Sequence, residues 1–178
     1  MNIIGKKVIL RAIEEKDLKL LHKWSNDPAI NYMLGGWHFP SSLQNLEGWH
    51  KKVGKDSLNQ RFSVDNHDGD LIGSANLVNI NWKDRNAFIG LLIGSKKQQG
   101  RGFGFDILMS LMKYSFEELG LERLDTTIIE NNDSSVKLFQ KCGWKKEGEK
   151  NKAYWRRNKF WSQLIYGITK ADYNTLNQ

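Results

Sequence analysis

The sequence predicts a mixed α/β fold in which helices pack on one central sheet. Three observations support this class. Short apolar stretches typical of strands recur along the chain, hairpins are expected near both ends, and a strand–helix–strand unit lies in the middle. With 178 residues, of which 39% are hydrophobic, the chain is long enough to bury one core, and we expect a single domain over residues 1–178.

The first half of the chain contains two expected helices. Residues 14–25 carry leucines and a tryptophan at helical spacing, and Asp27-Pro28 is expected to end this helix. Residues 43–53 form a second amphipathic pattern, after a loop over residues 32–40. Strand patterns occupy the rest of this half, at residues 7–12, 61–65, 71–82 and 87–94.

The second half contains the clearest helix, which follows a glycine-rich loop. Its apolar residues recur at helical spacing from Phe105 to Leu119, and Gly120 is suited to end it. A shorter helix is expected from Asn132 to Gly143. Strands flank that helix at residues 123–129, 144–155 and 159–169, and the last two are expected to turn at Arg157-Asn158.

Composition excludes several classes of protein. The single cysteine, Cys142, permits no internal disulfide, so a reducing compartment, the cytoplasm, is the simplest expectation. No apolar run reaches the roughly 18 residues of a membrane span, and the first residues lack the apolar region of a signal peptide. We therefore expect no membrane partner.

The formal net charge of +7 indicates an anionic partner. Residues 137–159 hold nine basic side chains against Glu147 and Glu149, so this stretch alone has a charge of +7. Such a run is either a solvated face or an edge that faces a bound anion. No nucleic-acid-binding motif accompanies it, and basic residues alone give non-specific, salt-sensitive binding, so nucleic acid is disfavoured as the partner.

A glycine-rich loop at residues 99–104 carries the strongest functional signal. It lies between an expected strand and the long expected helix. Glycines let the backbone approach a ligand closely, and a helix N-terminus offers unpaired N–H groups and a positive dipole, so the loop predicts a phosphate or pyrophosphate site. It follows about four strands rather than one and lacks Gly-Lys-Ser/Thr, which excludes a dinucleotide-binding fold and a P-loop.

Two motifs resemble those of the GNAT family of acyl-CoA N-acyltransferases. The loop, read as Gln99-x-x-Gly102-x-Gly104, resembles the family signature Gln/Arg-x-x-Gly-x-Gly/Ala. Downstream, Asn132-x-x-Ser135, followed by Leu-Phe and Gly-Trp, resembles the second family motif. The two motifs occur in the family's order and at its separation.

The resemblance spans most of the chain, residues 6–170, and the segments at residues 24–28 and 147–149 also resemble the RimJ/RimL-like branch of the family. It implies the GNAT fold, a twisted, mixed and mostly antiparallel sheet of about six or seven strands with helices on both faces. It also implies an N-acetyltransferase that uses acetyl-CoA as co-substrate, an amine as acceptor and no metal.

The resemblance further implies how acetyl-CoA is held. Its pyrophosphate is expected on the backbone amides of the loop, and its pantetheine along the strand before it. Asn132 and Ser135 are expected beside the thiol end, although Asn132 is also suited to cap the helix that it begins, and Ser135 to serve in its first turn. The expected cofactor-binding residues are Leu92, Ile93, Gly94, Gln99, Gly100, Arg101, Gly102, Phe103, Gly104, Asn132 and Ser135.

The chain departs from the family at both acid–base positions. Phe88 stands where many relatives have a glutamate, and Phe139 where many have the tyrosine that protonates the thiolate. Ser135 is the remaining hydroxyl of the second motif and the candidate to contact or protonate the thiolate. These losses motivate an alternative function, a GNAT-fold module that binds CoA but is catalytically weak or inactive.

The general base is sought elsewhere in the chain. Glu47 and His50, on the second expected helix, are our candidates to take the proton of the amine. His38, Asp65 and a path through water are the alternatives.

The loop over residues 32–40 is expected to bind the acceptor. Trp37, His38 and Phe39 stand there beside two glycines and a proline, where they are suited to line a pocket. Residues 30–62 hold more basic than acidic side chains, which mildly disfavours a polyamine and leaves a protein N-terminus, an aminosugar or another small amine. A homodimer is a candidate assembly.

Overall fold

The fold is organised around one eight-stranded sheet, which the computed structural model describes together with its helices over residues 1–36, 39–53 and 55–176. The strand order is β1-β2-β3-β4-β5-β6-β8-β7. Every neighbouring pair is antiparallel except β5 and β6, which are parallel, so the expected mixed sheet is confirmed. The strands are β1 Ile3–Ile4, β2 Val8–Arg11, β3 Gln60–Asn66, β4 Leu71–Asn81, β5 Asn86–Ile93, β6 Arg123–Ile129, β7 Lys145–Arg156 and β8 Lys159–Thr169.

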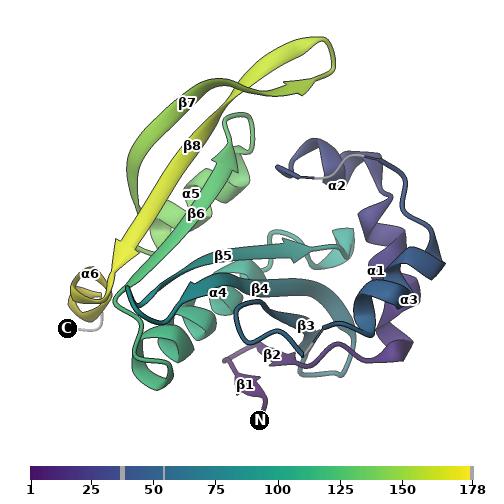
Figure 1. The fold of residues 1–178 in the computed structure, drawn as a ribbon, viewed down its shortest axis with the longest axis horizontal. Coiled ribbons are helices and arrows are strands. Elements are labelled where there is room, and N and C mark those ends of the chain that lie inside the picture. Colours follow the sequence, from purple (N-terminus) through teal and green to yellow (C-terminus); the bar gives the residue numbers. More distant parts are fainter. Residues whose placement is uncertain (37–38, 54, 177–178) are drawn as a thin grey trace.

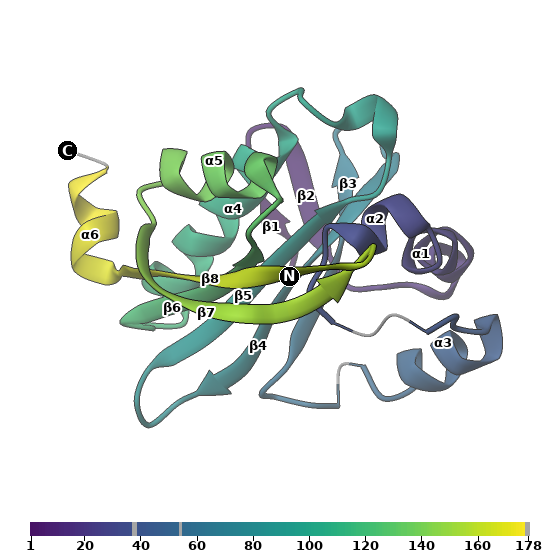
Figure 2. The same cartoon turned by 90° about the horizontal axis from the view of Figure 1, so that it is seen from above.

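Helices cover both faces of the sheet, as the GNAT fold requires. Figure 2 shows α4 and α5 on one face and α3 on the other. Within the described part of the chain, no helix has the length and the apolar character that crossing a membrane requires. The helices are η1 Glu15–Asp17, α1 Leu18–Ser25, α2 Pro28–Tyr32, α3 Leu43–His50, η2 Lys96–Gln98, α4 Phe103–Lys113, η3 Tyr114–Glu118, α5 Asp133–Lys141 and α6 Lys170–Thr175.

The pair Asp27-Pro28 begins a helix as well as following one. Helix α1 ends at Ser25 as expected, but Asp27 then caps α2, where its carboxylate accepts hydrogen bonds from the amides of Ala29 and Ile30. Proline is favoured at the first helical position, because its missing N–H would have no partner there. This short helix lies between α1 and the loop that was expected to bind the acceptor.

Most other element boundaries follow the sequence patterns. The long helix begins at Phe103, passes into a π-helical turn over Tyr114–Glu118, and is followed by Gly120 at φ 64°. The turn at Arg157-Asn158 has positive φ at both residues, as a tight hairpin needs. Helix α3 ends earlier than expected, and β1 and α6 were not expected from the sequence.

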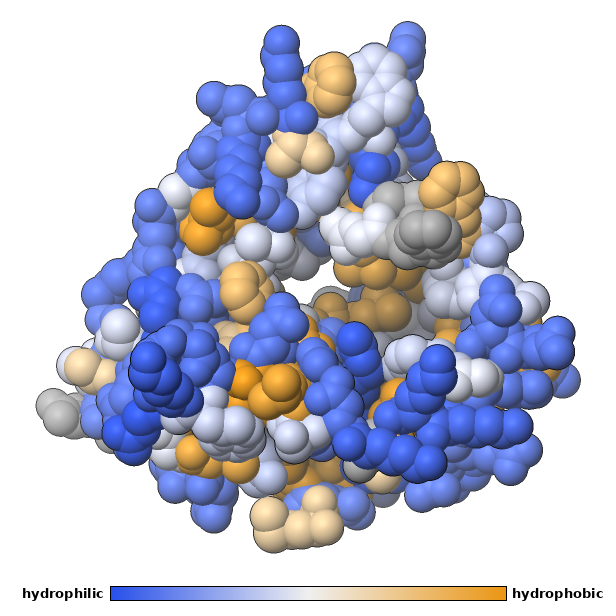
Figure 3. Space-filling model, viewed as in Figure 1, coloured by the Kyte–Doolittle hydropathy of each residue, from blue (hydrophilic) through white to orange (hydrophobic). Residues whose placement is uncertain are grey.

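The central feature of the sheet is the divergence of β5 and β6. The two strands pair only where Asn86, Ala87 and Phe88 lie beside β6, and they separate beyond that point (Figure 1). Thr126 Oγ1 donates a buried hydrogen bond of 2.9 Å to Ile89 O where the separation begins. Figure 3 shows that side chains leave a hollow here, between β5, α2 and the β7–β8 hairpin, which we call the central opening.

A buried ionic cluster fixes α1 on the sheet. Arg11 of β2 donates to both carboxylate oxygens of Asp17, at 2.6 and 2.9 Å, and also pairs with Asp65 of β3 at 2.6 Å. Burial alone would raise the pKa of Asp17, but hydrogen bonds from Arg11, the Glu14 amide and the Ser63 hydroxyl outweigh it and lower that pKa. The start of α1 is therefore held against β2 and β3.

Replacing Asp17 by asparagine should destabilise the fold. We expect the free energy of unfolding at neutral pH to fall by about 2–3 kcal/mol, because charged hydrogen bonds to Arg11 are lost. The folded-state pKa of Asp17 is depressed, so its contribution is fully present above the unfolded-state value of about 4 and is lost as the pH falls below it.

Urea unfolding at pH 7 and at about pH 3 measures this difference. The matched control is Asp68→Asn, in the exposed turn between β3 and β4, which should change stability little at either pH. A difference between wild type and Asp17→Asn that does not shrink in acid would contradict the assignment.

Candidate functional site

The glycine-rich loop leads into the start of α4 as the candidate site for an anion, and we call it the anion site. Gly100 and Gly102 adopt φ of 73° and 85°, a region that other residues rarely enter, and Gly102 is the N-cap of α4. No described residue accepts a hydrogen bond from the backbone N–H groups of residues 100–105. These groups, together with the positive end of the helix dipole, can bind a phosphate or pyrophosphate.

Three side chains hold this loop in place. Gln99 Nε2 donates to Ile93 O at 3.0 Å, and Lys7 Nζ donates to Arg101 O at 3.1 Å. The buried carboxylate of Asp106 accepts hydrogen bonds from three backbone amides of the segment that enters β2, at 2.6 to 3.1 Å. The loop is therefore preorganised by contacts to β5 and to the β1–β2 region.

Helix α5 approaches the same loop closely. Asn132 caps it, because its Oδ1 accepts from the amide of Ser135 at 3.2 Å. A Cβ atom at Gly104 would lie 3.1 Å from Leu138 Cδ2, so the glycine lets α5 pack against the start of α4. Lys141 Nζ lies 5.2 Å from the centre of the Phe105 ring and adds positive charge there.

One edge of β5 presents unpaired backbone groups to the central opening. Ile89 O accepts from Thr126, and Ile93 O accepts from Gln99, so both carbonyls point away from β4. Backbone groups of alternate residues in a strand point to the same side. The N–H and C=O of Leu91, which lies midway between Ile89 and Ile93, therefore also point away from β4 and into the opening. Leu91 was missed from the sequence, because strand alternation alone does not say which edge lacks a neighbour.

The other face of β5 borders a cavity of about 350 Å³, which we call the acceptor cavity. Leu92 of β5, which pairs with Ser74 of β4, lines this cavity. The same strand also borders the central opening. The cavity's other walls come from α1, α2, α3 and the neighbouring strands β3 and β4, and are mostly apolar or aromatic. Among the described residues that line it, Arg61 carries the one charge; Asn31, Ser74 and Asn76 supply further polar groups.

Gly94 has a packing role, and one of the three expected acceptor residues, Phe39, borders both cavities. A Cβ atom at Gly94 would lie 2.0 Å from the ring of Trp24, so this glycine is needed for packing. Phe39 lines the acceptor cavity and a second cavity of about 440 Å³ beside the hairpin tip, but Trp37 and His38 lie outside the described residues.

The two phenylalanines at the family's acid–base positions have different surroundings. Phe139 is buried and packs edge-on against Trp144, with ring centres 4.9 Å apart. Phe88 keeps 41% of its surface exposed, so it is not a core residue. Neither side chain can transfer a proton. The hydroxyl of Ser135 has no hydrogen-bond partner among the described residues and remains available.

The candidate bases do not converge on the opening. Glu47 is exposed on α3 and lines neither cavity, and His50 Nε2 lies 2.9 Å from Ile13 O. Asp65 is paired with Arg11. The thiol of Cys142 is buried, which raises its pKa to about 11 and removes it as a nucleophile. No three His, Cys, Asp or Glu side chains of the described residues gather as a metal site.

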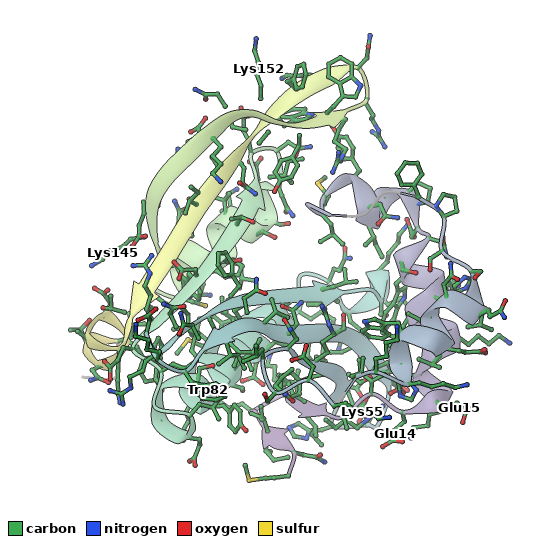
Figure 4. The ribbon with its side chains drawn as sticks, viewed as in Figure 1. Glu14, Glu15, Lys55, Trp82, Lys145 and Lys152 are labelled. Carbon is green, nitrogen blue, oxygen red and sulfur yellow. The ribbon has the colours of Figure 1, made fainter. Side chains whose placement is uncertain are left out.

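Much of the basic stretch at residues 137–159 faces away from the opening. Figure 4 shows Lys145 and Lys152 on β7 pointing outward from the hairpin, and Lys145 pairs with Asp172 of α6. Trp82 lies in the β4–β5 turn with 49% of its surface exposed. Lys145 and Lys152 are thus separate from the anion site, whereas Lys141 lies beside it.

Comparison with known proteins identifies the class. The family model "Acetyltransferase (GNAT) domain" matches residues 7–145, well over half of the chain, so the chain belongs to the GNAT acetyltransferase family. The protein is accordingly an acetyl-CoA-dependent N-acetyltransferase.

Individual relatives agree with this class. The spermidine N(1)-acetyltransferase of Vibrio cholerae serotype O1 is 30% identical over 146 residues, which cover 82% of this chain and 83% of that protein. An uncharacterized SPbeta prophage-derived N-acetyltransferase of Bacillus subtilis is 25% identical over 170 residues, 95% of this chain and 93% of that protein. The crystal structure of the Vibrio cholerae spermidine N-acetyltransferase in complex with CoA and spermine matches with a TM-score of 0.87 and 26% identity, and covers 94% of this chain and 98% of that one.

These relatives correct one expectation about the acceptor. The excess of basic residues over residues 30–62 predicts that polyamines are disfavoured, yet the Vibrio cholerae relative and the matching crystal structure are both of a spermidine acetyltransferase. A charge count along a segment is a poor guide, because many of its side chains point away from the cavity. The acceptor is therefore open to polyamines as well as to other amines.

Replacing Asp106 by alanine should weaken the structure that carries the loop. Three backbone N–H groups lose their acceptor, and we expect the free energy of unfolding to fall by about 2–4 kcal/mol. Chemical denaturation measures this loss. Asp133→Ala, an exposed first-turn carboxylate of α5, is the control and should cost less than about 1 kcal/mol. Equal losses in the two variants would contradict the anchoring role.

Proposed function

We propose that residues 1–178 form one acyl-CoA N-acyltransferase domain that transfers an acetyl group from acetyl-CoA to a primary amine, by direct attack in a ternary complex. One observation carries this proposal: Ile93 lies beside Gly104 at the start of α4, whereas its neighbour Leu92 lines the acceptor cavity, so the anion site and the cavity flank opposite faces of β5. A thioester lying along the free edge of β5 would face an amine that enters from the cavity. Fixing two substrates in this geometry removes much of the entropic barrier.

The proposed cofactor contacts fit the unpaired groups of the site. Of the loop at residues 99–104, the backbone amides of residues 100–104 bind the pyrophosphate, because the Gln99 amide already donates to Lys96 O. The free edge of β5, at Leu91 and the N–H of Ile93, binds the pantetheine amides. Leu92 and Gly94 shape the strand, and Asn132 and Ser135 lie beside the thiol end. A backbone N–H of β5 stabilises the oxyanion as the amine attacks, and Ser135 contacts the departing thiolate.

Proton removal from the amine is proposed to use water. Among the described residues that line the acceptor cavity, no carboxylate or histidine is present to take the proton. The amine therefore loses its proton to solvent in the opening before it attacks. Membership of the RimJ/RimL-like branch, a homodimeric assembly and a cytoplasmic location are further parts of the proposal.

The test is release of free thiol from acetyl-CoA across a panel of amines at several pH values. The panel contains spermidine and spermine, a peptide with a free N-terminus, glucosamine and a small aromatic amine. We expect at least one amine to accelerate thiol release, with kcat/KM rising in proportion to the unprotonated fraction of that amine, because no group of the described cavity takes the proton.

Two outcomes would contradict parts of this proposal. CoA binding without turnover of any amine would indicate a module that has lost catalysis. An inflection near about pH 6.5 that does not follow the pKa of the amine would indicate a histidine base, and His38→Ala would then be tested for its loss.

Gly102→Glu should abolish CoA binding while the protein stays folded. A carboxylate at the start of α4 would repel the pyrophosphate, and we expect affinity to fall by more than about hundredfold. The matched control is Gly69→Glu, because Gly69 has nearly the same φ, 86° against 85°, and lies in the β3–β4 turn. Calorimetric titration with CoA measures both variants; unchanged affinity in Gly102→Glu would contradict the loop assignment.

A further inference from the structure

Residues 33–36 follow α2 and form one border of the central opening; we call them the acceptor lip. Leu34 lines the acceptor cavity, and Asn31, just before the lip, lines both cavities. The lip therefore contributes directly to the surface that an acceptor meets. What holds it in place should influence acceptor binding more than cofactor binding.

Two long-range hydrogen bonds hold the backbone of the lip. Asn132 Nδ2, at the start of α5, donates to Met33 O at 3.0 Å, although the two residues are 99 positions apart. Arg156 Nη2, near the tip of the β7–β8 hairpin, donates to Leu34 O at 3.3 Å. Adjacent carbonyls of the lip are thus bound from two different elements on the far side of the opening.

A third contact comes from the hairpin. A Cβ atom at Gly35 would lie 2.5 Å from the hydroxyl of Tyr154, so the absence of a side chain lets the lip backbone approach this tyrosine. Gln163 of β8 donates to the same hydroxyl at 2.6 Å and fixes its position. Farther along the loop, Asn26 exchanges two hydrogen bonds with the backbone of Ser41, at 2.9 and 3.0 Å.

The side chain of Asn132 makes two different connections. Its Oδ1 accepts from the amide of Ser135 and from the hydroxyl of Ser134, at 3.2 and 2.9 Å, and so caps α5. Its Nδ2 holds Met33. The side chain is largely buried, with 9% exposed, so water is a poor substitute for either partner. One amide group therefore joins the helix of the second motif to the acceptor lip.

We propose that Asn132 is a positioning residue for the amine acceptor, because it holds the lip at Met33 while it caps α5. This inference rests on the proposed transfer to an amine in the acceptor cavity. The Nδ2 group of Asn132 then serves the binding of the amine substrate, through Met33, and its Oδ1 atom serves the cap of α5. These two roles can be separated by substitution.

Asn132→Asp separates them with almost no change in shape. The carboxylate keeps an oxygen that caps α5, but it has no donor for Met33 O and repels that carbonyl. With spermidine, and with any other amine that the panel shows to be acetylated, we expect KM for the amine to rise by about tenfold or more. KM for acetyl-CoA should rise by a smaller factor than KM for the amine, because the cap is retained.

A second readout needs no acceptor. Hydrogen–deuterium exchange should accelerate in peptides that cover residues 28–36, while peptides that cover residues 133–141 keep their protection. Asn132→Ser is the second variant, because a serine can cap α5 but is too short to reach Met33, and it should give the same pattern. Asn174→Asp, an exposed residue of α6, adds the same charge away from the opening and should change neither readout.

The outcomes separate this inference from the proposed function. Unchanged exchange of residues 28–36 in both Asn132 variants would show that Asn132 does not hold the lip, and would overturn the inference whatever the enzyme acetylates. Faster exchange with an unchanged KM for every acetylated amine would also overturn it, because the lip would then not position the acceptor. Absence of turnover with any amine in the wild type would instead overturn the proposed function.

Discussion

The separation of β5 from β6 is the constraint on which the rest of the structure depends. Two parallel strands that stay paired satisfy each other's backbone groups, whereas these two pair over three residues and then leave an edge unpaired. Thr126 satisfies the first free carbonyl and Gln99 the last, so the polar groups left over are those of the middle of the edge. The sheet is therefore not a continuous layer: it has an opening between β5 and β6, and the free edge of β5 faces this opening.

Around this opening, the chain relies on backbone groups and fixed dipoles more than on titratable side chains. The proposed anion site consists of amides at the start of α4, and the described lining of the acceptor cavity contains no carboxylate or histidine. The charged clusters of the molecule have structural tasks: Arg11, Asp17 and Asp65 fix α1, and Asp106 fixes the loop. Positioning of two substrates is the contribution that such a site makes most directly.

Local patterns were sufficient for most of the elements. Helical spacing and the following glycine located α4, and the residues of the hairpin turn located β7 and β8. The short helix α2 was missed because a proline after a helix is usually read as its end, and only the cap at Asp27 shows that a new helix begins. Helix α6 was missed because its six residues carry little apolar periodicity, although Thr169 and Asp172 form a capping box.

The sequence by itself determined the fold class, the family and the glycine-rich loop before α4, because glycine spacing and apolar periodicity are local properties that one stretch of chain expresses. The tertiary structure decided which distant residues meet. Asn132 lies 99 positions from Met33, and Arg156 reaches Leu34 only because the hairpin folds back across the opening. Likewise, Glu47 and His50 have chemistry suited to a base, but neither lines the acceptor cavity. Such juxtapositions depend on how the sheet twists and separates, and no local pattern encodes them.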